Sequence, residues 1–303
     1  MKPPLFLLAP PRSYTSIINS MIGQHPEAYG LPELNMFFYG TMLELWNPYP
    51  REVPFDKKST HGIVRTVAEI FTGEQTDRSI ECAEHWCAAR QKAPVGEVFN
   101  DIRKQLDPLI PVDKSPWYTL DINFLIRIIE SCPDAKFIHL TRHPTKQCES
   151  NLKYVNATIV KIMNSIDYTK DEAILEPQMV WHDMNINILN FLEGYVPKEQ
   201  YIRIRGENIM QNTQEELAKI CQWLGIRDDA EAIDEMMHPE RYPFANFGPI
   251  TALFGNDTNF LKGSKFRQHT PELPPLDAPV SWRKDGESLK AEVQELAREF
   301  GYQ

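Results

Sequence analysis

The sequence lacks the features that mark several common classes of protein. It has five cysteines but no CxxC pair, so we expect no disulfide framework and a reducing, cytoplasmic setting. No apolar run is long enough to span a membrane. Basic residues are not in excess either, because the formal net charge is −10, and this balance argues against a nucleic-acid partner.

Two short patterns resemble functional motifs, but we assign neither function. Cys82, His85 and Cys87 would suggest a metal site, but their spacing matches no common zinc pattern and no second ligand pair follows, so we predict no metal. The apolar start, Leu5 to Ala9, is too short for a signal peptide and is interrupted by Pro10-Pro11-Arg12. A buried first strand explains this start better.

What is present is an ordinary globular composition, with 42% hydrophobic and 24% charged residues. Apolar runs that predict strands alternate with segments of helical periodicity. The predicted strands are residues 5–9, 28–31, 109–113, 136–141 and 201–205. The predicted helices are residues 15–24, 33–46, 60–71, 76–90, 96–105, 119–131, 144 to beyond 154, 172–192, 213–224 and 287–300. Residues 48–54, 248–270 and 271–279 are predicted to be loops.

This alternation predicts an α/β fold with a central parallel sheet flanked by helices. We expect one domain over residues 1–303, with a helical region at residues 34–110. Ligands of such sheets bind beyond the carboxyl ends of the strands. Four predicted strands are followed there by a cation, at Arg12, Lys114, Arg142 and Arg205. We expect Arg205 to pair with a carboxylate such as Glu207 rather than with a ligand.

The loop between the first strand and the first helix can hold an anion. Backbone N–H groups at a helix N-terminus favour a phosphate or sulfate, and Arg12, Thr15 and Ser16 add side-chain donors. The loop contains no glycine, so it is not a Walker motif. An ordinary capped helix start explains the hydroxyl residues equally well, and this alternative stays open here.

Two segments far apart in the chain resemble the motifs of one enzyme family. PRSYTS, followed by IINSMIGQHPE, is similar to the 5′-phosphosulfate loop of sulfotransferases that use 3′-phosphoadenosine-5′-phosphosulfate (PAPS). FIHLTRHPTKQCESNL resembles the family's 3′-phosphate motif, in which a strand ends in Arg and a Ser lies two helical turns later. VDKSP, YIRIRGENI and GNDTNF resemble further motifs in the family's order, the last in a cofactor-covering loop of bacterial and polyketide-synthase members.

The resemblance implies a fold and an activity. We expect a P-loop-nucleotide-hydrolase-like sulfotransferase fold with a helical acceptor-binding insertion at residues 34–110 and a cofactor-covering loop at residues 245–270. The implied reaction transfers a sulfuryl group from PAPS to a hydroxyl of a small-molecule or acyl-carrier-bound acceptor. It gives a sulfate ester and 3′-phosphoadenosine 5′-phosphate (PAP) and needs no metal.

The resemblance also implies which residues bind the cofactor. They are Arg12, Ser13, Tyr14, Thr15, Ser16, Arg142, Ser150, Lys262 and Gly263. Tyr14 replaces the family's usual glycine, so its side chain must point away from the cofactor or the loop must have another shape. The basic set Lys262, Lys265 and Arg267 is explained equally well as a solvated loop.

The catalytic roles follow from the same match. Arg12 and Lys114 are expected to stabilise charge on the bridging and sulfuryl oxygens. Glu33 matches a catalytic glutamate of several branches, and His61 is a second candidate for the base because it opens a predicted helix. Glu33 is explained otherwise as a first-turn helix carboxylate. Pro116 stands where other branches carry the His of a K-x-H motif.

Two other functions compete with this interpretation. A P-loop-like small-molecule kinase would need a Walker lysine and Mg²⁺, and the glycine-free loop argues against it. A non-catalytic nucleotide-binding module would bind PAP without transferring a group. The combination of Arg12, Lys114 and a candidate base disfavours that module.

Overall fold

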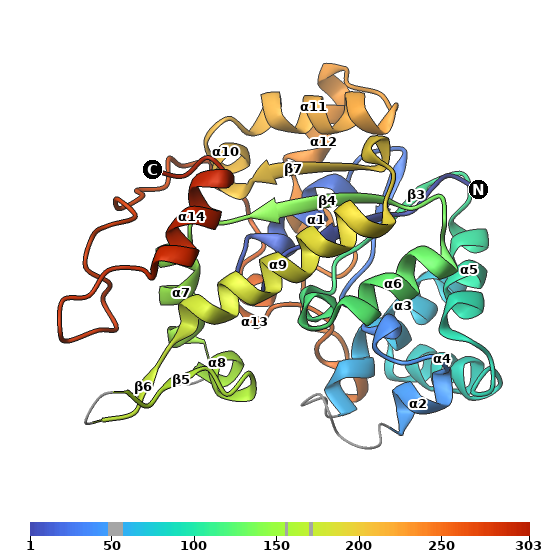
Figure 1. The fold of residues 1–303 in the computed structure, drawn as a ribbon. Coiled ribbons are helices and arrows are strands. Elements are labelled where there is room, and N and C mark those ends of the chain that lie inside the picture. Colours follow the sequence, from blue (N-terminus) through green and yellow to red (C-terminus); the bar gives the residue numbers. More distant parts are fainter. Residues whose placement is uncertain (48–56, 155–156, 170–171) are drawn as a thin grey trace.

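The structure is a computed structural model that describes residues 1–47, 57–154, 157–169 and 172–303. Five strands form the central sheet in the order β2-β3-β1-β4-β7 (Figure 1). Their bounds are Leu5–Leu8 for β1, Ala28–Gly30 for β2, Ile110–Asp113 for β3, Lys136–Thr141 for β4 and Tyr201–Arg205 for β7. Every neighbouring pair is parallel, which confirms the predicted sheet. The carboxyl ends of these strands therefore lie at one edge.

The topology makes the end of β1 a natural binding position. The chain leaves β1 for the side of β2 and β3, and later crosses to β4 and β7 on the other side. The loop after β1 consequently lies where the strand order reverses, which is where ligands of open α/β sheets bind. That loop carries Arg12.

Both faces of β1 are buried, as its continuous apolar run predicts. Phe6 and Leu8 point into one hydrophobic cluster, and Leu5 and Leu7 into another. This alternation is the two-residue period of a strand covered on both sides. Burying one such side chain contributes about 1.5–3 kcal/mol to folding.

Helices form a layer on each face of the sheet, as Figure 1 shows for α9 and α6 in front and α1 behind. The cluster around Phe6 is completed by α3 (His61–Thr72), α4 (Asp77–Ala88), α5 (Val95–Leu106), α6 (Ile122–Ser131) and α9 (Pro177–Tyr195). The cluster around Leu5 is completed by α1 (Thr15–Gly23), α10 (Gly206–Gln211), α11 (Thr213–Leu224) and α12 (Ala230–Met236).

The remaining elements are short. The α-helices are α2 (Met42–Trp46), α7 (Pro144–Lys153), α8 (Thr158–Ile162), α13 (Thr258–Lys262) and α14 (Ala291–Glu299). The 3₁₀ turns are η1 (Met36–Phe38), η2 (Lys57–Thr60), η3 (Pro116–Leu120), η5 (Lys198–Gln200), η6 (Pro239–Arg241) and η7 (Ile250–Ala252). A small antiparallel pair consists of β5 (Ile166–Asp167) and β6 (Ile174–Leu175).

The helix predicted for residues 33–46 is wrong. Asn35 adopts the left-handed conformation at φ 55°, so the chain forms only the short η1 turn after it. Helix α2 then starts anew at Thr41, whose side chain forms a capping box with Glu44. The alternative explanation of Glu33 as a first-turn helix residue is therefore also wrong, because Glu33 is not helical.

Other boundaries differ from the prediction. Helix α7 ends at Lys153 rather than beyond residue 154, and the helix predicted for residues 119–131 starts only at Ile122, because residues 116–120 form η3. Helix α9 starts at Pro177 rather than residue 172, because residues 174–175 pair in β6. Helix α14 starts at Ala291 rather than residue 287. The predicted loop 248–270 contains α13, which begins after Asp257, a side chain that accepts from the backbone N–H groups of Asn259 and Phe260. The predicted loop 48–54 lies outside the described residues.

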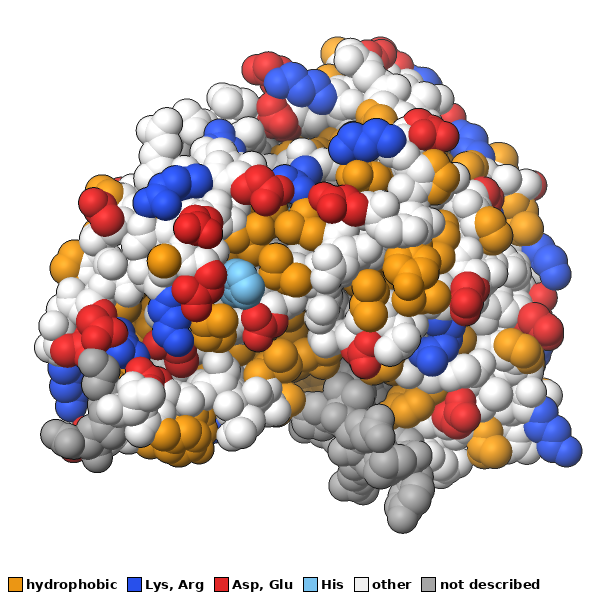
Figure 2. All heavy atoms as spheres, viewed as in Figure 1, with side chains coloured by type: hydrophobic (Ala, Val, Ile, Leu, Met, Phe, Trp, Pro, Cys, Tyr) orange, Lys and Arg blue, Asp and Glu red, His pale blue; other side chains and the backbone are white. Residues whose placement is uncertain are grey.

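Charges of both signs are interspersed on the face drawn in Figure 2. Within the described ranges, no helix is long and apolar enough to cross a membrane. The same part of the chain contains no cluster of three or more His, Cys, Asp or Glu side chains that could hold a metal ion. Cys82 is exposed on α4, whereas Cys87 is buried.

Candidate functional site

A cavity of about 500 Å³ opens at the edge where the strands end. The loop after β1, the turn after β4 with helix α7, and the segment around α13 all contribute to its wall. It is lined by Arg12, Tyr14, Thr15, Ser16, Ile17, Arg142, Ser150, Met210, Asp257, Asn259, Phe260, Gly263, Lys265, Phe266, Arg267 and His269. Residues of the two distant sequence motifs therefore line one cavity.

The loop after β1 is held in an unusual shape. Arg12 and Tyr14 both have positive φ angles, of 71° and 61°. The side chain of Gln147 donates to the carbonyl of Pro11 at 2.7 Å, and Arg142 donates to the carbonyl of Arg12. Tyr14 precedes α1 as its N-cap but makes no side-chain capping bond. The explanation of this loop as an ordinary Ser- or Thr-capped helix start is therefore wrong.

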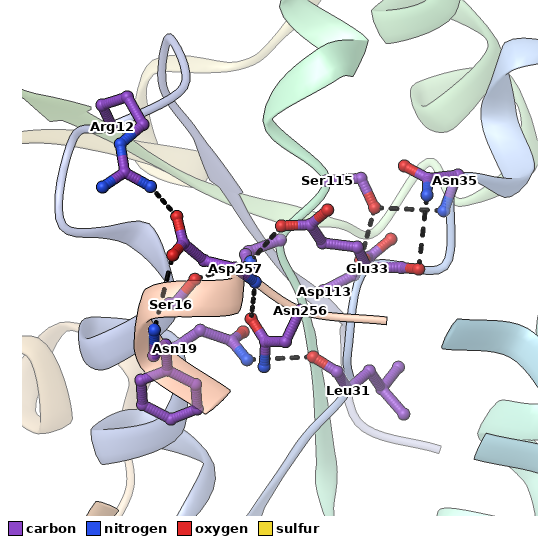
Figure 3. A network of polar contacts seen from close by, with 12 residues as sticks. Arg12, Ser16, Asn19, Leu31, Glu33, Asn35, Asp113, Ser115, Asn256 and Asp257 are labelled. Carbon is purple, nitrogen blue, oxygen red and sulfur yellow. Dashed lines mark hydrogen bonds and ion pairs between the residues drawn. The ribbon is translucent and has the colours of Figure 1, made fainter. Parts of the chain in front are cut away.

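The guanidinium group of Arg12 contacts α7 and the start of α13, and Figure 3 shows its pair with Asp257. Its Nε donates to Ser150 Oγ at 3.1 Å, and its Nη1 pairs with the carboxylate of Asp257. It also lies over the ring of Tyr154, 5.0 Å from the ring centre. Burial lowers the pKa of Arg12, and the nearby Arg142 lowers it further. Two cations so close together favour an anion between them.

Arg142 approaches the same cavity from the end of β4. Its guanidinium lies over the ring of Tyr14, 4.4 Å from the ring centre. Its backbone carbonyl accepts from the indole N–H of Trp181 at 2.9 Å. Its Nε is buried and has no hydrogen-bond partner among the described residues. An unsatisfied buried donor on a charged group is costly, and an anionic ligand in the cavity would relieve this cost.

Lys114 connects the first loop to the segment after β2. Its ammonium group is fully buried, donates to Ser16 Oγ at 2.9 Å and pairs with the carboxylate of Glu33, which is 20% exposed. Burial lowers the pKa of Lys114, and the Glu33 carboxylate opposes that shift. Ser16 lines the cavity, so Lys114 contacts the cavity wall through Ser16, and Glu33 contacts Lys114.

The backbone around Glu33 is fixed by two close neighbours. The N–H of Glu33 donates to the carbonyl of Gly255 at 2.8 Å. The backbone of Gly62, in the first turn of α3, packs so tightly that a Cβ there would lie 1.9 Å from the Glu33 carbonyl oxygen. Only glycine at position 62 permits this approach, which holds Glu33 against Lys114.

Beneath Lys114, Asp113 forms a buried polar network (Figure 3). Its two carboxylate oxygens accept from Ser115 Oγ at 3.2 Å and from the Tyr118 hydroxyl at 3.4 Å. Ser115 Oγ in turn accepts from the N–H of Asn35 at 3.2 Å. Burial raises the pKa of Asp113 to about 7, although its hydrogen bonds and Lys114 favour the ionised form.

Five predicted site residues are not among those that line the cavity: Lys114 and Glu33, described above, and Ser13, Lys262 and His61. Ser13 is fully buried, and its hydroxyl has no partner among the described residues. Lys262 is exposed on α13 and is not among the lining residues, whereas Gly263, Lys265 and Arg267 are. His61 begins α3, where its Nδ1 accepts from the N–H of Phe254 at 3.1 Å and its ring stacks on Phe254.

Arg205 does not form the expected pair with Glu207. It donates to the carbonyl of Gly301 at 2.6 Å, and its guanidinium lies over the ring of Tyr302. The carboxylate of Glu207 accepts instead from the backbone N–H of His143 and from the Tyr302 hydroxyl, both at 2.9 Å. These contacts stabilise the turn that carries Arg142.

Sequence reasoning did not single out several residues of the cavity wall, although all of them except Met210 lie in the expected covering loop at residues 245–270. Met210, Phe260 and Phe266 supply apolar surface, and Asp257 supplies a carboxylate against Arg12. The Asp257-Thr258-Asn259 pattern is a helix-start signal that could have revealed α13. No local signal in the sequence indicates that Asp257 meets Arg12, because 245 positions separate the two residues.

Comparison with known proteins now identifies the family. Residues 3–230 match the family model described as the sulfotransferase family, and the chain belongs to that family. The sulfotransferase domain from the curacin biosynthetic pathway has a similar fold, with 23% identity, a TM-score of 0.76, and coverage of 100% of this chain and 99% of that one. The sulfotransferase domain of the Synechococcus PCC 7002 olefin synthase has 23% identity, a TM-score of 0.72, and coverage of 100% and 97%. No match is found among curated proteins.

The buried carboxyl group of Asp113 generates a prediction about pH. Its pKa of about 7 in the folded protein lies above the ordinary value of 3.8, so the folded state holds the proton more tightly. The resulting stabilisation is complete below pH 3.8 and is lost as the pH rises to 7. Asp113→Asn mimics the neutral acid. The free energy of unfolding of this variant, compared with that of the wild type, should therefore be higher at pH 8 than at pH 5 by at least about 1 kcal/mol, which corresponds to roughly 2–4 °C in melting temperature.

Thermal unfolding of both proteins from pH 5 to pH 8 measures this effect. Asp121→Asn is the matched control, because the Asp121 carboxylate caps α6 in an exposed hydrogen bond. We expect that variant to follow the wild-type pH profile. A constant difference between Asp113→Asn and the wild type across the range would show that Asp113 is ionised throughout.

Proposed function

We propose that this chain transfers a sulfuryl group from PAPS to the hydroxyl of a small-molecule or carrier-bound acceptor, giving a sulfate ester and PAP. The observation that carries the proposal is the meeting of two separated motifs at one cavity. Arg12 and Ser150 are in hydrogen-bond contact, and Arg142 binds the carbonyl of Arg12. Membership of the sulfotransferase family supports the same reaction class.

The cavity fits a nucleotide that carries anions at two positions. Arg142 and Ser150 would bind the 3′-phosphate, and the unsatisfied Nε of Arg142 supplies a donor for it. Arg12, Thr15 and Ser16 would bind the 5′ side, together with the loop backbone. Met210, Phe260 and Phe266 offer apolar surface for the adenosine. Gly263, Lys265 and Arg267 would cover the nucleotide from the α13 side.

The remaining residues suit a direct transfer between two oxygens. PAPS supplies a sulfuryl group that is already activated, so the protein has to align the reactants and balance charge. The acceptor oxygen forms a bond to sulfur while the bond from sulfur to the 5′-phosphate oxygen breaks. Arg12 and Lys114 would stabilise the electron pair left on that phosphate oxygen. Glu33 would take the proton from the acceptor hydroxyl.

The contacts of the two candidate bases favour Glu33. Its carboxylate touches Lys114, which in turn binds Ser16 on the cavity wall, so base and leaving-group cation are neighbours. The Nδ1 of His61 already accepts the backbone N–H of Phe254. We assign proton abstraction to Glu33 and a supporting position to His61.

The acceptor would enter from the side of residues 34–110. Met36, Phe37, Phe38 and Tyr118 are buried in the hydrophobic core on that side. An apolar or amphipathic alcohol, or a hydroxyacyl chain on a carrier, suits an acidic protein better than a polyanionic glycan. The cytoplasm remains our proposed location, because the cysteine pattern suits a reducing compartment.

Nucleotide binding tests the donor directly. PAP should raise the melting temperature by several degrees at saturating concentration, because it binds only the folded protein. ATP with Mg²⁺ should raise it far less, since the first loop has no Walker glycines or lysine. Stabilisation by Mg²⁺-ATP without stabilisation by PAP would support a kinase and overturn the proposal. Incubation with labelled PAPS and a panel of alcohols then identifies the acceptor.

Glu33→Gln tests the base. Removal of a positioned general base typically lowers turnover 10²- to 10⁴-fold, and we expect a loss of that order. The affinity for PAP should remain within a few-fold, because Glu33 is not among the residues that line the cavity. Turnover with a responsive acceptor and PAP titration measure the two effects. Full activity of Glu33→Gln would remove this residue from the mechanism.

Asp257→Asn tests the carboxylate inside the anion site. The Asp257 side chain occupies Nη1 of Arg12, so it competes with an incoming phosphate or sulfate. Asparagine caps a helix as well as aspartate does, so the change removes charge and keeps the start of α13. We expect Asp257→Asn to bind PAP about threefold or more tightly.

Calorimetric titration with PAP measures this gain. Asp229→Asn is the matched control, since Asp229 caps α12 and pairs with Arg227 at positions that do not line the cavity. It should leave PAP affinity unchanged. Weaker binding by Asp257→Asn would mean that the Asp257–Arg12 pair belongs to the ligand-bound site.

A further inference from the structure

Tyr14 is a large side chain at a backbone position that favours glycine. Its φ of 61° lies in the left-handed region, which few non-glycine residues occupy. Strained conformations of this kind persist where the surroundings stabilise them, and they gather at functional sites. The contacts of its ring indicate what this side chain does.

The ring occupies space left open by a glycine that lies just after strand β7. Gly206 follows β7 directly and starts α10. A Cβ at position 206 would lie 2.6 Å from Cδ2 of Tyr14 and 3.3 Å from the carbonyl oxygen of Thr141. Any larger residue at position 206 would therefore displace the ring. Tyr14 and Gly206 fit each other as a pair.

The other contact of the ring is the guanidinium group of Arg142, 4.4 Å from the ring centre. An arginine over a tyrosine face is held by cation–π attraction. Arg142 is also fixed at one edge, where Nη1 binds the carbonyl of Arg12. Its buried Nε has no partner in the described part of the chain. The ring and the carbonyl together limit the orientations of a cation that lines the cavity.

We propose that Tyr14 is a positioning residue that orients Arg142 toward the 3′-phosphate of the nucleotide, and that Gly206 is required because it makes room for the Tyr14 ring. This inference rests on the proposed function, which assigns the 3′-phosphate to Arg142. Tyr14 acts through Arg142, so its effect is confined to ligands that carry a 3′-phosphate. A general role in shaping the loop would affect all nucleotides alike.

The test compares PAP with adenosine 5′-monophosphate, which lacks the 3′-phosphate. Tyr14→Asn removes the ring at a residue type that tolerates the left-handed conformation. We expect it to weaken PAP binding about threefold to tenfold and to leave binding of the monophosphate within twofold. Tyr14→Phe keeps the ring and should match the wild type for both ligands. An equal loss for both nucleotides in Tyr14→Asn would overturn the positioning role.

Gly206→Ala tests the pairing from the other side. Its added methyl group should displace the ring and produce the same selective loss for PAP. Combined with Tyr14→Asn, it should add little, because the ring that it displaces is gone. An equal cost of Gly206→Ala in both backgrounds would show that Gly206 serves another purpose and would overturn the pairing. Melting temperatures confirm that each variant is folded.

The same experiment separates this inference from the proposed function. If the wild type binds PAP and the ratio of the two affinities is unchanged in Tyr14→Asn, only the role of Tyr14 is wrong. If the folded wild type binds neither PAP nor the monophosphate, the proposed function fails, and the inference fails with it.

Discussion

The buried ammonium group of Lys114 is the constraint on which the site depends. A charge without water is stable only with partners, and Lys114 has two, Ser16 and Glu33. These partners come from α1 and from the segment after β2, so one cation ties three elements together. The close approach of Gly62 to the Glu33 backbone extends this arrangement to α3. The site is thus rigid on its inner side.

The outer side of the site is held by different forces. Arg12 is shared between Ser150 and the ring of Tyr154, which belong to α7 and its C-terminal end, and Asp257, which caps α13. These contacts are polar and partly exposed, so each can exchange for a ligand at small cost. The cavity thus has a buried charge on its inner side and, under the proposed function, a more exposed wall where a nucleotide would enter.

Much of this arrangement could be predicted from local patterns. Four of the five strands are largely apolar, and β7 alternates apolar and basic residues. Parallel pairing brings Arg12, Lys114 and Arg142 to one edge. What failed depends on contacts between distant segments. Asn35 interrupts the helix expected at residues 33–46 in a left-handed conformation, with its N–H on Ser115, 80 positions away. Lys265 and Arg267 line the cavity and Lys262 does not. This difference likewise depends on the path of the chain after α13.

The concentration of cations at one strand edge of a chain with net charge −10 has a kinetic consequence. In dilute buffer the repulsion of the whole molecule reaches an approaching polyanion before Arg12 and Arg142 can attract it. At physiological ionic strength, a screening length of about 8 Å removes the distant repulsion and keeps the near attraction. Under the proposed function, the capture of an anionic nucleotide would therefore be fastest at intermediate salt, whereas a uniformly basic protein captures such a ligand ever more slowly as salt is added.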